Sequence, residues 1–180
     1  MTASIDGQKV AFLVANEGVE QVELTTPWSA VRNAGAIPYL LAPEMGRVQA
    51  FNHLDRADTF DVDLPVGDVH VEDYDALVLP GGVANGDLLR TNSAAVEFVR
   101  SFVESDRPVA VICHGSWILI EADVVRHRTL TSWPSLRVDV INAGGTWVDE
   151  PVHVDGNLIS SRKPDDLEAF CESLIDAAAR

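Results

Sequence analysis

Cys113 is the residue whose sequence neighbours best suit a nucleophile. A β-branched run at residues 109–112 ends at Cys113, and a new apolar segment begins within three residues, which predicts a buried strand that turns sharply into a helix. Gly115 supplies the small residue that such a turn requires two positions after the nucleophile. The first amides of the helix would face the sulfur and favour its anionic form. We therefore predict a reactive thiolate at Cys113, with His114 beside it.

The surrounding chain predicts an open α/β sheet that would position this turn, because apolar runs typical of buried parallel strands alternate with segments of helical spacing. The expected strands are residues 10–15, 37–42, 74–79 and 109–112, with shorter ones near 47–50, 60–64, 129–134, 146–148, 152–154 and 158–160. The expected helices are residues 20–35, 92–103, 136–143 and 163–180, and one after Cys113. Residues 16–19 are expected to form a loop, and residues 51–58 a loop excursion that reaches the site.

In such a sheet, ligands bind outside the carboxyl ends of the strands. Residues 15–23, 80–87 and 113–117 all follow strand ends, so the topology predicts that these three segments converge.

Length and composition narrow the class of protein. A chain of 180 residues fits one domain, expected over residues 1–180. The formal charge of −15 and the lack of a basic cluster disfavour nucleic acid and anionic membranes as partners. Two cysteines make no disulfide framework. The chain shows no signal peptide and no apolar run of membrane-spanning length, so we expect a cytoplasmic protein.

Several segments together resemble the DJ-1/PfpI superfamily along essentially the whole chain. They are residues 15–24, 75–82 and 110–115; residues 131–144 and 160–167, which are similar to the PfpI branch; and residues 51–60, which are similar to bacterial general-stress members of that branch. The resemblance implies a flavodoxin-like three-layer α/β/α sandwich with a mostly parallel sheet, of the class I glutamine amidotransferase-like kind. It also implies a homodimer or higher homo-oligomer with the site near a subunit interface, and we expect no cofactor and no metal.

The resemblance also assigns roles around Cys113. It implies that Cys113 is the nucleophile and that Glu23 touches the sulfur. Glu23 would have to be protonated, since a carboxylic acid can donate a hydrogen bond to a thiolate whereas a carboxylate would repel it. The backbone amides of Gly82 and His114 match the family's oxyanion hole.

His114 is the expected general base, and it needs an orienting carboxylate. In PfpI-like proteases a neighbouring subunit lends a glutamate shortly after the Pro-Gly-Gly turn. Asp87 takes that role here only if one inserted residue is allowed, which weakens the match to a protease-type triad. Ser116 stands where many members carry Pro, and we expect it to cap the following helix.

Other residues carry two interpretations each. Glu20, one turn before Glu23, could join it. His53 with Asp55 could form a second acid–base pair in the pocket, or His53 could be a solvated loop residue. Trp133 fits a pocket wall or a half-buried core indole. Cys171 fits core packing better than a redox role, and Cys113 itself could be a small apolar residue ending a core strand. His70, His127 and His153 are scattered and suggest no metal cluster.

Three functions agree with these residues. The first is a cysteine-dependent hydrolase, a PfpI-like intracellular peptidase or stress-response protein, in which thiolate attacks a carbonyl carbon and His114 moves the proton. The second is glyoxalase or protein deglycase activity on methylglyoxal or its adducts, which needs only an activated thiol and a proton shuttle. The third is a non-enzymatic stress sensor, in which Cys113 is oxidised to sulfenic or sulfinic acid.

Overall fold

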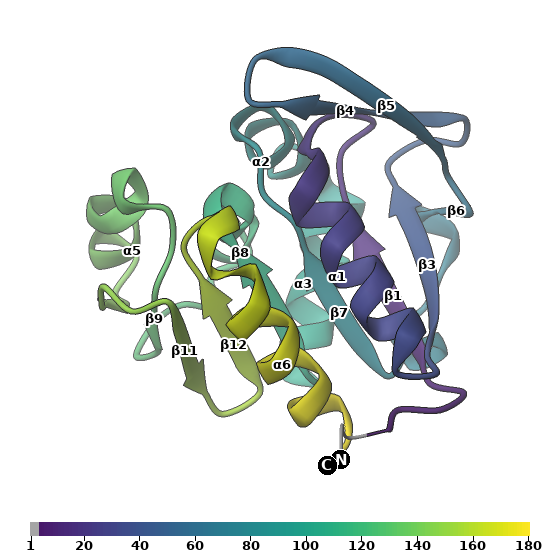
Figure 1. The fold of residues 1–180 in the computed structure, drawn as a ribbon. Helices are drawn as coiled ribbons and strands as arrows, with labels where there is room; N and C mark the ends of the chain where they lie inside the picture. The colour runs from purple at the N-terminus through teal and green to yellow at the C-terminus, as the bar shows by residue number, and fades with distance from the viewer. Residues whose placement is uncertain (1–3) are drawn as a thin grey trace.

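The computed structural model describes residues 4–180 and is built on a seven-stranded sheet with the strand order β11-β12-β8-β7-β1-β3-β6 (Figure 1). Every neighbouring pair is parallel except β11–β12, which is an antiparallel hairpin. The strands are β1 (Lys9–Leu13), β3 (Ile37–Ala42), β6 (Leu64–Pro65), β7 (Ala76–Leu79), β8 (Val109–Ile112), β11 (Val152–Asp155) and β12 (Leu158–Ser161). The expected central strands are confirmed, whereas the strand expected near residues 60–64 is divided between β6 and a strand outside this sheet that ends at Asp61.

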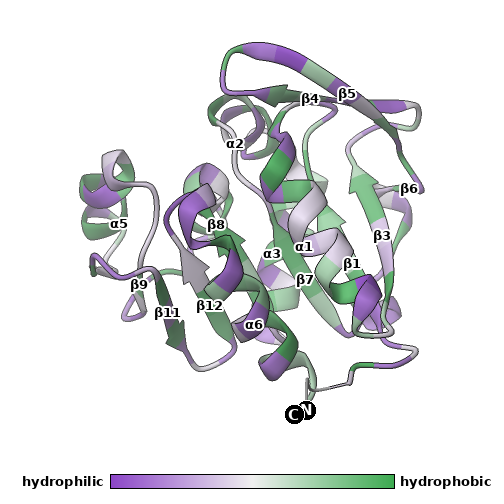
Figure 2. Ribbon diagram, in the orientation of Figure 1, coloured by the Kyte–Doolittle hydropathy of each residue, from purple (hydrophilic) through white to green (hydrophobic). Residues whose placement is uncertain are grey.

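Helices cover both faces of this sheet because its strands are apolar on both sides. The helices are α1 (Gln21–Asn33), α2 (Val83–Leu89), α3 (Ser93–Glu104), α4 (Ser116–Glu121), α5 (Arg137–Asn142) and α6 (Leu167–Ala178). Side chains alternate along β1: Val10 and Phe12 pack into a cluster with residues of α1 and α6, whereas Ala11 and Leu13 pack with residues of α3 and α4. Figure 2 shows the hydrophobic central strands between the mixed helices. The layers confirm the flavodoxin-like sandwich.

A three-stranded sheet lies outside the main one and corrects two expectations. Its central strand is β4 (Arg47–Asn52), which pairs with β2 (Glu17–Glu20) on one side and with β5 (Asp55–Asp61) on the other. The predicted loop at residues 16–19 is thus largely strand, and the predicted excursion is a β-hairpin whose turn is His53–Leu54. The polar residues of this segment concealed strand periodicity, since most of β5 faces solvent. In Figure 1 the hairpin crosses the top of the molecule.

The remaining elements are short. A parallel pair joins β9 (Thr129–Leu130) and β10 (Thr146–Trp147), and 3-10 turns occur at Val66–Asp68, Val71–Asp73, Cys113–Gly115, Pro134–Leu136 and Pro164–Asp166. Helix α2 was not expected from the sequence. It begins after Gly82, whose φ of 98° lies in the left-handed region that favours glycine, and it spans only two turns. Among residues 4–180, every helix is too short or too polar to cross a membrane.

Candidate active site

The turn after β8 holds Cys113 in a strained conformation at the edge of the sheet. Its φ is 61°, in the left-handed region that non-glycine residues avoid at a cost of roughly 1–2 kcal/mol. The predicted requirement for Gly115 is confirmed, because a Cβ there would lie 2.6 Å from the carbonyl oxygen of Leu79 on the neighbouring strand. The predicted sharp turn from strand to helix is therefore present at Cys113.

The sulfur of Cys113 lies 3.3 Å from Nδ1 of His114. Burial raises the pKa of the Cys113 thiol, and a negative charge on Glu23 would raise it further, whereas the amides of His114 and Gly82 lower it. Burial therefore opposes ionisation of the sulfur while the two amides favour it, and the resting thiolate stays a prediction. A thiol at this position would need a base to take its proton when it reacts.

Glu23 lies in the first turn of α1 and is completely buried. Its Oε2 accepts a hydrogen bond of 2.8 Å from the amide of Gly81, while Oε1 has no partner among the described residues. Burial raises the pKa of Glu23 to about 8, and the nearby Glu20 adds to the rise. Glu23 is thus neutral at pH 7, as the sequence argument required. Gly81 lets the carboxyl and the thiol approach, because a Cβ there would lie 2.7 Å from Cβ of Cys113.

The imidazole of His114 is surrounded by aromatic rings. Its centroid lies 5.8 Å from the ring of Trp133 in a stacked arrangement and 5.1 Å from the ring of Trp117 edge to face. Burial lowers the pKa of His114, so the ring is neutral near pH 7 and can accept a proton. Among residues 4–180, no carboxylate hydrogen-bonds to this imidazole.

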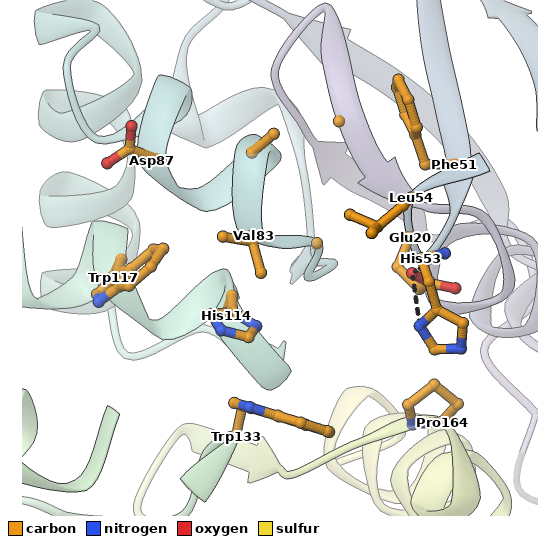
Figure 3. A pocket seen from close by; sticks show the side chains of 13 residues that line it. Glu20, Phe51, His53, Leu54, Val83, Asp87, His114, Trp117, Trp133 and Pro164 are labelled. Atoms are coloured by element: carbon orange, nitrogen blue, oxygen red, sulfur yellow. Dashed lines mark hydrogen bonds and ion pairs between the residues drawn. The ribbon is translucent and has the colours of Figure 1, made fainter. Parts of the chain in front are cut away.

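A pocket of about 730 Å³ opens beside the turn (Figure 3). It is lined by Gly18, Glu20, Phe51, His53, Leu54, Gly82, Val83, Ala84, Asp87, His114, Trp117, Trp133 and Pro164. Cys113 does not form its wall and is only 7 % exposed. A substrate in the pocket would meet His114, whose Nδ1 lies 3.3 Å from the sulfur of Cys113.

Most of the predicted site residues lie together at the pocket. Glu20, His53 and Trp133 line it, but the predicted pair of His53 and Asp55 does not form. The backbone amide of His53 donates to Oε2 of Glu20 at 3.1 Å, and its Nδ1 lies 3.9 Å from the same oxygen. Asp55 pairs with Asn52 in the hairpin ladder, so the hairpin turns His53 toward β2 instead.

Two further expectations concern Asp87 and Ser116. Asp87 is an exposed residue of α2 that lines the pocket without a hydrogen bond to His114 within the described chain. Ser116 caps nothing: its hydroxyl is buried and unpartnered, because the 3-10 turn at residues 113–115 continues directly into α4.

The pocket also contains residues that the sequence did not single out: Phe51, Leu54, Val83, Trp117 and Pro164. Four of them lie in segments that were expected to reach the site, residues 51–58, 80–87 and 113–117, and Trp117 also follows His114 by three positions on a predicted helix. Pro164 comes from the turn before α6, and its position depends on tertiary packing.

Other titratable residues lie away from the pocket. Cys171 is buried in α6, where burial raises its pKa to about 11. Nδ1 of His153 lies 2.8 Å from Glu150. In residues 4–180 no group of three or more histidine, cysteine or acidic side chains is arranged to hold a metal ion.

Comparison with known sequences finds proteins that are similar to this chain over most of its length. A sequence model of the DJ-1/PfpI family matches residues 8–177. A deglycase of Pyrococcus horikoshii is 43 % identical over 167 residues, which cover 93 % of this chain and 97 % of the relative. YraA of Bacillus subtilis, named as a candidate cysteine protease, is 39 % identical over 163 residues, covering 91 % of this chain and 94 % of the relative.

Solved structures agree with the fold. A two-domain protein of Anabaena variabilis with DJ-1/ThiJ/PfpI-like and ferritin-like domains superposes with a TM-score of 0.89 at 32 % identity, covering 94 % of this chain and 47 % of that one. DJ-1beta of Drosophila melanogaster gives a TM-score of 0.86 at 25 % identity, covering 97 % and 92 %.

Proposed function

The chain belongs to the DJ-1/PfpI family, and on that footing we propose that it is a cysteine-dependent enzyme that attacks carbonyl carbons, with deglycase or glyoxalase activity on methylglyoxal or its adducts. Cys113 would be the nucleophile, His114 the proton carrier and Glu23 the neutral acid beside the sulfur. The amides of Gly82 and His114 would stabilise the oxygen that becomes negative during attack.

One observation carries the choice between substrates: the sulfur of Cys113 lies 3.3 Å from an imidazole that has no orienting carboxylate in the described chain. Peptide hydrolysis needs a base and an acid aligned with the leaving amine. Addition of a thiol to an aldehyde needs only a proton shuttle, which the neutral His114 can provide. The pairing of Cys113 and His114 therefore supports aldehyde chemistry better than peptide cleavage.

The proposed reaction with methylglyoxal balances without an external oxidant. The sulfur of Cys113 bonds to the aldehyde carbon, and the thiol proton passes through His114 to the aldehyde oxygen, which gives a hemithioacetal. A proton then moves from that carbon to the neighbouring ketone carbon through an enediol, while the hydroxyl proton of the hemithioacetal moves to the ketone oxygen, which gives a thioester of lactate. Water hydrolyses the thioester, releasing lactate and restoring the thiol.

The test compares the native protein with Cys113→Ser after incubation with methylglyoxal, with an unfolded protein and with peroxide. Loss of methylglyoxal with stoichiometric lactate, abolished in Cys113→Ser, is the expected result. Fragmentation of an unfolded protein without lactate formation would favour a peptidase instead. Addition of oxygen to Cys113 by peroxide, read by intact mass, without turnover of either substrate, would favour the stress sensor.

A peptidase is the second candidate, because Asp87 lies on the pocket wall and its side chain is exposed to solvent. A homodimer with the site near its interface could bring the partner's Asp87 to His114 as the missing carboxylate. Asp87→Asn would then reduce cleavage of an unfolded protein at least tenfold and leave methylglyoxal turnover within twofold. Equal losses of protein cleavage and of methylglyoxal turnover would argue against a role of Asp87 in peptide cleavage alone.

A further inference from the structure

His114 is held by rings rather than by a charged group. Trp133 stacks on the imidazole with an angle of 27° between the ring planes, and Trp117 meets it at 62°. Figure 3 shows the imidazole of His114 between these two side chains. In the described chain the only side-chain atom in hydrogen-bond range of the imidazole is the sulfur of Cys113. We call Trp117 and Trp133 the indole clamp.

The Trp117 half of the indole clamp is itself fixed. Its Nε1 donates a 2.9 Å hydrogen bond to Oδ2 of Asp139, which joins α4 to α5 across 22 residues of sequence. The guanidinium of Arg90 lies 5.8 Å from the centre of the indole and 3.3 Å from Glu121. An indole has a single polar donor, so the hydrogen bond to the exposed Asp139 favours one rotation of the ring.

A general base works only when its ring is held in the correct orientation, and usually a third polar group holds it. Here the indole of Trp117 contacts the imidazole in place of such a polar group. The carboxylate of Asp139 contacts the indole and not the imidazole. We propose that Trp117 and Asp139 are positioning residues for His114, with Asp139 on α5 acting through the indole of Trp117; this rests on the proposed role of His114 as proton carrier.

The contact between Asp139 and Trp117 could otherwise serve only to dock α5, and three variants separate the two roles. Asp139→Leu removes the acceptor, Asp139→Asn keeps an acceptor oxygen and removes the charge, and Asn142→Leu makes a polar-to-apolar change at an exposed position of the same helix. We expect kcat for methylglyoxal to fall about fivefold to tenfold in Asp139→Leu, with KM within twofold. Asp139→Asn and Asn142→Leu should stay within twofold of the native kcat.

A second measurement does not depend on turnover. The imidazole of His114 is titrated by NMR in protein carrying labelled histidine, with His114→Gln to assign its signal. Loosening the indole clamp admits water to the ring, so the pKa of His114 should rise toward its ordinary value in Asp139→Leu and remain unchanged in Asp139→Asn. Thermal unfolding of each variant separates this change from a loss of folded protein.

The outcomes distinguish the two proposals. An unchanged pKa of His114 in Asp139→Leu overturns the positioning role, as does an equal loss of kcat in Asn142→Leu. Equal effects of Asp139→Leu and Asp139→Asn overturn the role of the hydrogen bond. A native protein that leaves methylglyoxal intact overturns the proposed function, whereas the titration still shows whether Asp139 positions the imidazole.

Discussion

The two cysteines of this chain are equally buried and differ in everything that faces the sulfur. Cys113 and Cys171 are each 7 % exposed, and burial raises the pKa of both thiols. Cys171 lies inside helix α6 in the hydrophobic core, where burial is the sole cause of its shift. Cys113 lies on a strained turn beside His114 and Glu23. Burial alone therefore does not identify a reactive cysteine; the groups directed at the sulfur do.

Matched alanine variants give the largest expected difference between the two sites. Cys113→Ala should lower kcat/KM for methylglyoxal by about 10³-fold or more, because no other group can form the bond to carbon. Cys171→Ala should leave activity within twofold and lower the free energy of unfolding by about 1 kcal/mol through lost packing. Lactate formation and urea unfolding measure these effects. Comparable losses of activity in both variants would contradict the assignment of Cys113 as the sole nucleophile.

The neutral Glu23 has no counterpart beside Cys171, and it should make stability depend on pH. Its pKa is about 8 in the folded protein against an ordinary value of 4.5, so the native state holds one more proton between these values. The contribution of this bound proton to the free energy of unfolding is complete below pH 4.5. It is lost as the pH rises through 8, by up to about 1.4 kcal/mol per pH unit.

Urea unfolding at pH 5, 6.5 and 8 measures this dependence. Glu23→Gln cannot titrate, so its free energy of unfolding should decline less with pH than that of the native protein. Glu97→Gln, at an exposed position of α3, serves as the control and should follow the native curve. A native curve parallel to that of Glu23→Gln would show that Glu23 is ionised in the folded state.

The smallest expected difference is in chemical reactivity. Iodoacetamide under native conditions at pH 7.5 should modify Cys113 about tenfold faster than Cys171, because His114 can take the thiol proton and two amides face the sulfur. Peptide mass spectrometry over time measures both rates. His114→Ala should remove most of the difference, and a faster reaction at Cys171 would contradict the assignment of the nucleophile.

Patterns of adjacent residues predicted the parts of this protein that depend on local sequence. The apolar runs predicted the central strands, and the residues around Cys113 predicted the turn, because both follow from backbone geometry within a few positions. Asn92 begins the helix expected at residues 92–103, and as the cap of α3 its side chain accepts a hydrogen bond from the amide of Ala95 at 2.9 Å. Such features need no information from distant segments.

Predictions that required a distant partner were less accurate. Pairing with a separate strand made β2 from an expected loop, and the hairpin placed His53 against Glu20 rather than Asp55. The prediction of a thiolate counted the local amides but not the burial of Cys113 by the whole fold, which raises the pKa of its thiol.

The sequence by itself determined which residues could react and the turn that presents them, since residue type and short-range backbone preferences are encoded locally. The tertiary structure alone decided how those residues are ionised and oriented. A pKa depends on the dielectric surroundings and neighbouring charges that folding assembles, and the orientation of His114 depends on indoles held by α4 and α5.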